Sequence, residues 1–155
     1  MSTLIRDGLI TEDLWQLLPE SGEGDAAPLP AEGRILLPLP RWLEERRNGL
    51  RAACGVWLQP DEDPLRLLPD LPTLPVIALR FPVFTDGRAY SQARLLRQRH
   101  GFAGELRAIG DVLPDQLSAM ARCGFDAFVL RADQSPAAAL AALSGGPRPT
   151  WPRVP

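Results

Sequence analysis

The sequence predicts a single α/β domain built on a mainly parallel sheet. Short apolar runs recur along the chain, each is followed by a stretch with helical periodicity, and glycine or proline separates one from the next. About five such strand–helix units fit between residues 33 and 144. Because parallel neighbours need a crossover connection, this alternation favours a parallel sheet. The pattern leaves open whether the sheet is open and doubly wound or curved like part of a barrel.

Composition supports one ordinary globular domain and excludes several classes of function. The chain has 155 residues, of which 45% are hydrophobic and 23% charged, enough for a genuine core. A formal net charge of −2 gives no electrostatic case for nucleic-acid binding. All 17 basic residues are arginine. The absence of lysine from the sequence excludes Schiff-base chemistry and a P-loop lysine.

The chain is expected to be cytoplasmic and to lack a metal or cofactor. No apolar run approaches the roughly 18 residues of a membrane helix, and the first residues do not resemble a secretory signal. Cys54 and Cys123 form no Cys-x-x-Cys motif, and His100 is the single histidine, so no metal or iron–sulfur site is predicted. We expect both thiols to be buried, with a redox-active Cys123 as the alternative.

The two ends of the chain are predicted to flank the domain rather than to form it. Residues 1–32 are expected to hold a short helix over Ile10–Leu18, with Thr11 as its N-cap and an apolar face formed by Leu14, Trp15 and Leu18. The stretch Pro19–Pro30 is expected to be a flexible loop. Residues 145–155 form a proline-rich tail, in which Trp151 is either part of a disordered segment or an anchor for a partner.

The first half of the domain is predicted to contain two strands and two helical segments. The strands are the apolar runs Ile35–Leu37 and Cys54–Leu58. A helix over Arg41–Arg47 follows the first strand and ends at Asn48 and Gly49, which are typical C-terminal residues. A shorter helical segment, Leu65–Leu68, follows the second strand.

The second half is predicted to contain three more units. The strands are Val76–Phe81, Glu105–Ile109 and Asp126–Leu130. The first strand is followed by a helix from about Ala89 to His100 whose inner stripe is expected to hold Ala89, Ala93 and Leu96, with Arg94, Arg97 and Arg99 facing mostly outward. The other two helices begin near Pro114 and Ser135 and end near Gly124 and Leu143.

Charged side chains follow these strands at the points where they end. Ligands of parallel α/β proteins bind at this carboxyl edge, and guanidinium groups there suit planar or tetrahedral oxyanions. We therefore predict an anion or acidic-partner site. Its candidate residues are Arg80, Thr85, Asp86, Arg88, Tyr90, Asp111, Gln116 and Arg131. The alternative is that Asp86 and Asp111 are caps and that the arginines pair with them for structural reasons.

No catalytic or nucleotide-binding motif accompanies this edge. The sequence contains no GxGxxG, no Walker A motif and no Ser-His-Asp candidate. Nucleotide or flavin binding would therefore have to use an unconventional site, and no catalytic residue is assigned.

Three blocks of sequence resemble a bacterial family of unknown function, DUF934. The blocks are FPVFTDGRAYSQARLLR from Phe81 to Arg97, GELRAIGDVLPDQL from Gly104 to Leu117, and RCGFDAF from Arg122 to Phe128. The similarity extends back through Gly55–Leu58 and Trp42–Glu44 and covers roughly residues 34–143.

The resemblance implies a role in sulfur metabolism. Members of the family are described as oxidoreductases linked to sulfite reduction and are typically encoded beside a sulfite or nitrite reductase. No catalytic residue can be transferred to this chain from the resemblance. The description as an oxidoreductase can therefore refer to the pathway and not to an activity of this polypeptide.

Three functions follow from these expectations. The first is an accessory protein that docks on sulfite reductase or on its electron donor. The alternative is a small enzyme or carrier that binds a sulfite- or sulfate-like anion at the arginine-rich edge. A scaffold role is the third.

Overall fold

The secondary structure follows an α/β pattern after an initial all-β segment. The computed structural model describes residues 3–20, 29, 33–49 and 54–144. The strands are β1 (Thr3–Arg6), β2 (Leu9–Thr11), β3 (Trp15–Leu17), β4 (Arg34–Pro38), β5 (Cys54–Leu58), β6 (Val76–Phe81), β7 (Glu105–Gly110) and β8 (Ala127–Leu130). The helical segments are α1 (Leu39–Arg47), η1 (Pro64–Asp70), α2 (Arg88–Arg94), η2 (Leu95–Arg99), η3 (Pro114–Gln116), α3 (Leu117–Cys123) and α4 (Pro136–Ser144).

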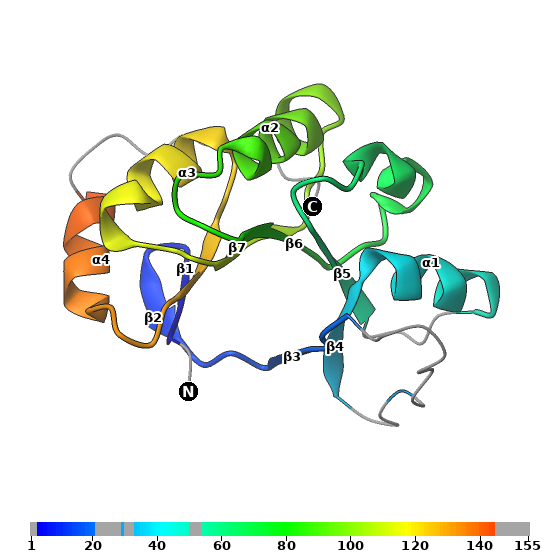
Figure 1. Ribbon diagram of the computed structural model, residues 1–155, viewed down its shortest axis with the longest axis horizontal. Coiled ribbons are helices and arrows are strands. Elements are labelled where there is room, and N and C mark those ends of the chain that lie inside the picture. The colour runs from blue at the N-terminus through cyan, green and yellow to red at the C-terminus, as the bar shows by residue number, and fades with distance from the viewer. Residues whose placement is uncertain (1–2, 21–28, 30–32, 50–53, 145–155) are drawn as a thin grey trace.

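The described strands form one sheet that curls into a half-barrel (Figure 1). Their order is β2-β1-β8-β7-β6-β5-β4-β3. Strands β3 to β8 pair in parallel, whereas β1 pairs antiparallel with both β2 and β8. The prediction of a mainly parallel α/β domain is therefore confirmed, and the sheet is curved rather than open and doubly wound.

The helices cover one face of this sheet. Strands β4 to β8 lie side by side in chain order, so each right-handed crossover returns over the same face. Figure 1 shows α1, α2, α3 and α4 along the outer, convex side of the curve. The concave side has no helix among the described residues, and β3 runs along it.

Apolar side chains pack on both faces of the sheet. The larger cluster joins the convex face to the helices and includes Trp42, Leu79, Phe81 and Phe125. The smaller cluster lies on the concave face and consists of Leu36, Trp57, Val76, Ala78 and Ile109, with Trp15 and Val129 packed against it. This division follows from the strand period of two, which sends neighbouring residues to opposite faces.

The helix expected over Ile10–Leu18 is wrong, because the segment contains two short strands and no helix. Residues 9–11 form β2 and residues 15–17 form β3. Asp7 and Gly8 between β1 and β2 have φ angles of 52° and 79°, the positive values that a type I′ hairpin turn requires. Asp-Gly between apolar residues strongly indicates a hairpin. The helical spacing of Leu14, Trp15 and Leu18 nevertheless led to the prediction of a helix.

Pairing with neighbouring strands explains why residues 10–18 do not form a helix. Thr11, expected as an N-cap, lies opposite Leu4 in the hairpin, and Trp15 lies opposite Arg34 in the parallel β3–β4 ladder. A nine-residue helix is marginal in water on its own, whereas a segment added to a sheet edge gains hydrogen bonds already templated by its neighbour. The predicted loop at Pro19–Pro30 lies almost wholly outside the described residues, as does the proline-rich tail.

The remaining helices agree with the sequence in position. Ala89, Ala93 and Leu96 are buried on the inner side of α2 and η2, as expected. Cys54 and Cys123 are buried, and no disulfide joins them. Within the described ranges, no helix has both the length and the hydropathy that a bilayer-spanning segment needs.

Arg97 was expected to face outward but is 3% exposed. Its Nε donates to the carbonyl of Gly124 at 2.8 Å, and its Nη1 donates to the carbonyls of Phe102 and Gly104 at 2.7 Å each. Its Nη2 lies 3.2 Å from a carboxylate oxygen of Asp126. This side chain therefore ties the end of the helix to the segments that enter β7 and β8.

Gly124 is required by this arrangement. Its φ angle is +120°, and a Cβ at this position would lie 2.3 Å from Cγ of Arg97. The π-type turn η2, in which His100 N donates to Leu95 O at 3.2 Å, closes the helix beside it. The helical pattern placed Arg97 on the surface because it does not show that carbonyl groups of other segments will accept hydrogen bonds from this guanidinium.

We predict that Arg97→Met destabilises the fold by about 3 to 5 kcal/mol, because it leaves Asp126 and three carbonyls without their buried donor. Arg99→Met is the matched control, since Arg99 is an exposed arginine of the same turn, and we expect a change within about 0.5 kcal/mol. Urea denaturation followed by circular dichroism measures both. Equal effects of the two substitutions would contradict the structural role of Arg97.

Candidate functional site

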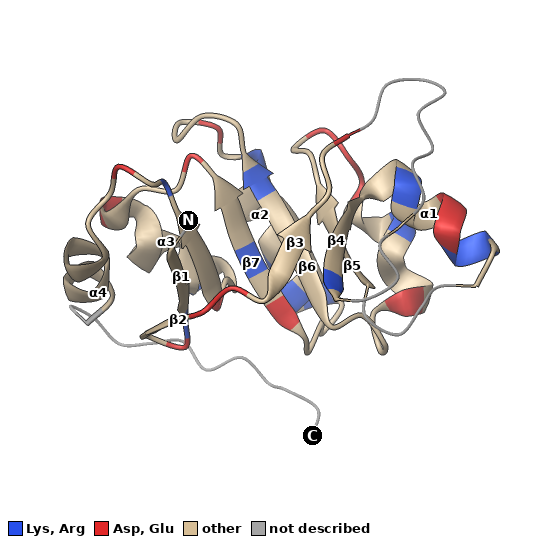
Figure 2. Cartoon of the chain, turned by 90° about the horizontal axis from the view of Figure 1, so that it is seen from below, with Lys and Arg blue, Asp and Glu red and all other residues tan. Residues whose placement is uncertain are grey.

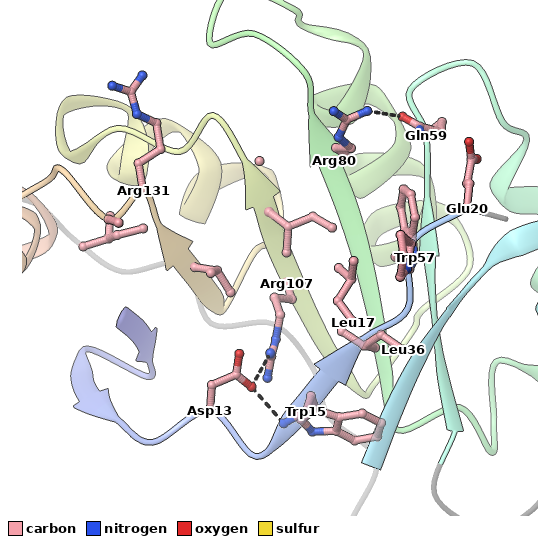
Figure 3. Close-up of a pocket in the computed structure, with 16 residues that line it drawn as sticks. Asp13, Trp15, Leu17, Glu20, Leu36, Trp57, Gln59, Arg80, Arg107 and Arg131 are labelled. Atoms are coloured by element: carbon pink, nitrogen blue, oxygen red, sulfur yellow. Dashed lines mark hydrogen bonds and ion pairs between the residues drawn. The ribbon is translucent and has the colours of Figure 1, made fainter. Parts of the chain in front are cut away.

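A cavity of about 670 Å³ lies on the concave face of the half-barrel (Figure 3). Its walls come from β3, β4, β5, β6, β7 and β8 and from the residues that follow them. Figure 2, seen from the open side, shows basic positions on the strands at the middle of the sheet, with an acidic position at their lower end. The lining residues that the argument below uses are Asp13, Trp15, Leu17, Leu36, Trp57, Gln59, Arg80, Arg107, Ile109, Val129 and Arg131.

Arg80 stands at the carboxyl end of β6, on the rim of this cavity. Its Nη1 donates to Oε1 of Gln59 at 2.9 Å (Figure 3). Gln59 belongs to the segment that leaves β5, and this segment is held by the buried amide of Gln92 on α2. Nε2 of Gln92 donates to the carbonyls of Gln59 and Glu62 at 3.0 and 2.8 Å. Arg80 is thus positioned through two neutral side chains.

The charge of Arg80 is not balanced by a neighbouring acid. Among the described residues no carboxylate lies within ion-pair distance of its guanidinium, whereas Arg107 and Arg131, which also line the cavity, each pair with two. Burial strengthens the attraction of such a cation for an anion, because less water screens it. Arg80 is half-buried. It is therefore the cavity guanidinium that is best placed to bind a negatively charged group.

Arg131 shares the rim but is already engaged. Its Nη1 donates to Oδ1 of Asp111 at 2.6 Å, its Nε donates to Oδ1 of Asp133 at 2.9 Å, and its Nη2 contacts Oδ2 of Asp133. These hydrogen bonds lower the pKa of Asp111 below its usual range and that of Asp133 to about 2. The same contacts raise the pKa of Arg131.

Thr85 and Asp86 lie in the loop after β6, Arg88 begins α2, and none of the three lines the cavity. Nη2 of Arg88 donates to Oδ2 of Asp86 at 2.7 Å, and the Arg88 amide donates to Oδ1 at 3.0 Å. The Arg88 side chain lowers the pKa of Asp86 to about 2. Thr85 and Arg88 are exposed. Arg80 and Arg131 thus line the same cavity, and Asp111 is joined to it through its ion pair with Arg131, whereas Asp86 and Arg88 form a separate pair.

Asp111 and Gln116 hold the backbone of Phe84. Oδ2 of Asp111 accepts from the Phe84 amide at 2.7 Å, and Nε2 of Gln116 donates to the Phe84 carbonyl at 3.2 Å. The side chain of Phe84 is nevertheless 46% exposed, next to Val83 at 52%. A large aromatic is therefore presented to solvent on a backbone that is fixed from both sides.

Tyr90 lies away from the cavity, on the helix-covered face. Its ring packs edge-on against Phe81 with centroids 5.2 Å apart, and it joins the larger core cluster. Burial raises the pKa of its hydroxyl. Tyr90 was predicted as a contact residue of the strand-end site, and its position on α2 separates it from Arg80 and Arg131 by the thickness of the sheet.

Arg107 is a cavity residue that the sequence analysis did not identify. It points inward from β7, is 1% exposed, and donates to Asp13 at 2.9 Å and to Glu105 at 2.8 Å (Figure 3). Its Nη2 is buried and has no acceptor among the described residues. A charged residue at the centre of an apolar strand was the available signal, since such a residue is rarely buried without a specific role.

The apolar wall of the cavity was also missed. Trp57 is fixed by a hydrogen bond of 2.8 Å from Nε1 to the carbonyl of Leu18, and it packs beside Leu36 and Ile109. The alternation of large residues in β4, β5 and β7 indicates that both sheet faces are apolar, but it does not indicate that one face lacks helices. The lack of helices on the concave face follows from the order of the strands in the sheet, and the sequence analysis did not predict that order.

Comparison with known proteins identifies a family. A model described as a bacterial protein of unknown function, DUF934, matches residues 55–147. The chain belongs to the DUF934 family. The matched segment includes β5 to β8 and therefore Arg80, Arg107, Asp111 and Arg131 of the site. The DUF934 chain has no significant match to a curated protein or to a solved structure.

Among the residues that the structure describes, no group of three or more histidine, cysteine, aspartate or glutamate side chains is arranged to hold an ion. The described cavity is lined by guanidinium groups, by indole rings and by the carboxylates of Asp13 and Glu20.

The rim carboxylates yield a prediction about pH. Because the folded pKa of Asp133, about 2, lies below the ordinary 3.8, its pair with Arg131 stabilises the fold above about pH 4, and this contribution is lost as the pH falls toward 2. In Arg131→Gln the pKa values of Asp111 and Asp133 should rise toward 3.8. Arg88→Gln is the control, since it should raise the pKa of Asp86 alone. Carboxyl carbon NMR titrations measure all three, and an unchanged Asp133 in Arg131→Gln would contradict the assignment.

Proposed function

We propose that this DUF934 protein binds a sulfur oxyanion at the rim of its concave cavity and serves cytoplasmic sulfite reduction as an accessory protein. The main support for the proposal is the position of Arg80 and the side chains that contact it. This half-buried guanidinium lines the cavity, is oriented by neutral Gln59, and has no carboxylate partner among the described residues. An anion of the sulfite or sulfate type would supply the missing charge through paired, charge-assisted hydrogen bonds.

The case for an anion rests on Arg80 itself and not on the net charge of the cavity, because the carboxylates of Asp13 and Glu20 also line it. Arg131 lies on the same rim, and its two aspartates are occupied by its own guanidinium. The resemblance to a family linked with sulfite reduction supplies the sulfur chemistry. The proposal assigns binding and no catalytic step, since no described residue is positioned as a nucleophile or a redox group.

Titration with sulfate and with sulfite tests this proposal. We expect Arg80→Gln to weaken binding about 10- to 100-fold, because hydrogen bonds to a charged group contribute about 1.5 to 3 kcal/mol. Arg88→Gln is the matched control, since Arg88 is exposed, paired with Asp86 and outside the cavity. Isothermal titration calorimetry gives the dissociation constants. Wild-type protein that binds neither anion, or that loses binding equally in both variants, would contradict the proposal.

A second function, docking on sulfite reductase or on its electron donor, is favoured by Phe84. This exposed ring stands on a backbone held by Asp111 and Gln116, so little conformational entropy would be lost when a partner covers it. Rigid exposed aromatics are common anchors of protein interfaces. The neighbouring exposed Val83 extends the apolar surface.

Co-purification with sulfite reductase tests the docking function. From cells grown on sulfate, Phe84→Ser should retain at most about a tenth of the reductase that wild-type protein retains. Leu65→Ser serves as the control, because Leu65 is an exposed apolar residue on η1, far from the Phe84 loop in sequence and 40% exposed. Reductase that is absent with wild-type protein, or equal in both variants, would exclude Phe84 as the anchor.

A further inference from the structure

The size of the cavity exceeds what an inorganic oxyanion needs. Its volume of about 670 Å³ corresponds to roughly twenty water molecules in the liquid. It falls within the range of about 300 to 1,000 Å³ that is typical of sites for organic ligands. A sulfite ion bound to Arg80 would occupy only one end of this space.

Polar and apolar groups are segregated along the cavity. At the carboxyl end of the strands lie Gln59, Arg80 and Arg131. On the same face lie the buried residues Trp57, Leu36 and Ile109 of the concave cluster, and Leu17 and Val129 also line the cavity but keep exposed surface. The opposite end is closed by the ion pair of Arg107 with Asp13. A guanidinium at one end of an apolar wall is complementary to an amphipathic anion.

We propose that the ligand of this cavity is a planar organic molecule that carries a terminal oxyanion, a sulfonate, sulfate ester or phosphate ester. This inference rests on the proposed function and extends it by naming the ligand class. The oxyanion binds Arg80 at the rim. The planar body lies against Trp15, Leu17 and Val129, the cavity residues that keep exposed apolar surface, and burying this surface adds affinity that an inorganic ion cannot gain.

The test compares 2-naphthalenesulfonate with sulfate and with neutral 2-naphthol, by calorimetry on the full chain. We expect 2-naphthalenesulfonate to bind at least tenfold tighter than sulfate and tenfold tighter than 2-naphthol, since it alone meets both the cation and the apolar wall. Comparing the affinities of 2-naphthalenesulfonate and 2-naphthyl phosphate distinguishes a sulfonate-type from a phosphate-type ligand. Tight binding of either compound supports the inference.

Variants separate the two ends of the site. Arg80→Gln should weaken the binding of 2-naphthalenesulfonate about tenfold or more. Leu17→Glu should weaken it to a similar extent, because it places a negative charge on the cavity wall at a position that is 41% exposed. Val129→Glu, half-buried on β8, is the second wall variant and covers the case in which one of them fails to fold. Leu9→Glu on β2 is the control, because Leu9 is 69% exposed and outside the cavity.

The outcomes distinguish this inference from the proposed function. If sulfate binds through Arg80 and 2-naphthalenesulfonate binds no tighter, the organic ligand is excluded and the oxyanion site stands. If 2-naphthol binds as tightly as the sulfonate, or the wall variants bind like Leu9→Glu, the apolar wall is not the site and the inference is wrong. If neither sulfate nor the sulfonate binds, both proposals fail together.

Discussion

The architecture depends on one topological constraint. Five consecutive parallel strands, β4 to β8, lie side by side in chain order, so their crossovers all return over the same face. The helices therefore cover the convex side, and the concave side must be filled by the strands' own side chains and by the chain before β4. Trp57, Trp15 and Arg107 take this role. A closed eight-stranded barrel fills its interior from every side, whereas the half-barrel keeps a cavity.

Arginine serves three different purposes in this domain. Arg97 is buried among carbonyls and acts as a structural connection between the helix layer and the sheet. Arg107 and Arg131 are held by pairs of carboxylates, which fixes their orientation at the cost of their net charge. Arg80 alone among the cavity arginines is held by an amide, so its orientation is fixed and its charge is retained. The partners, more than the residue type, decide which guanidinium is suited to bind a ligand.

Much of the fold was predictable because strand–helix alternation is a local property. The five parallel strands, their helices and the strand-end positions of Arg80, Asp111 and Arg131 followed from apolar runs and from the turns that end them. Residues 10–18 were misassigned as a helix because their helical spacing competes with pairing partners that lie elsewhere in the sequence. Arg97 was misplaced because burial of a polar group depends on carbonyls supplied by other elements. The cavity depends on strand order, which no local pattern encodes.

Asp111 divides its two carboxylate oxygens between different loops. Oδ1 accepts from Arg131 after β8, and Oδ2 accepts from the Phe84 amide after β6. The connections that follow three neighbouring strands are thus linked through a single side chain. A bound group that drew Arg131 toward itself would change the charge that Asp111 presents to Phe84. The loop that carries the exposed aromatic and the rim of the half-barrel's cavity therefore share one carboxylate.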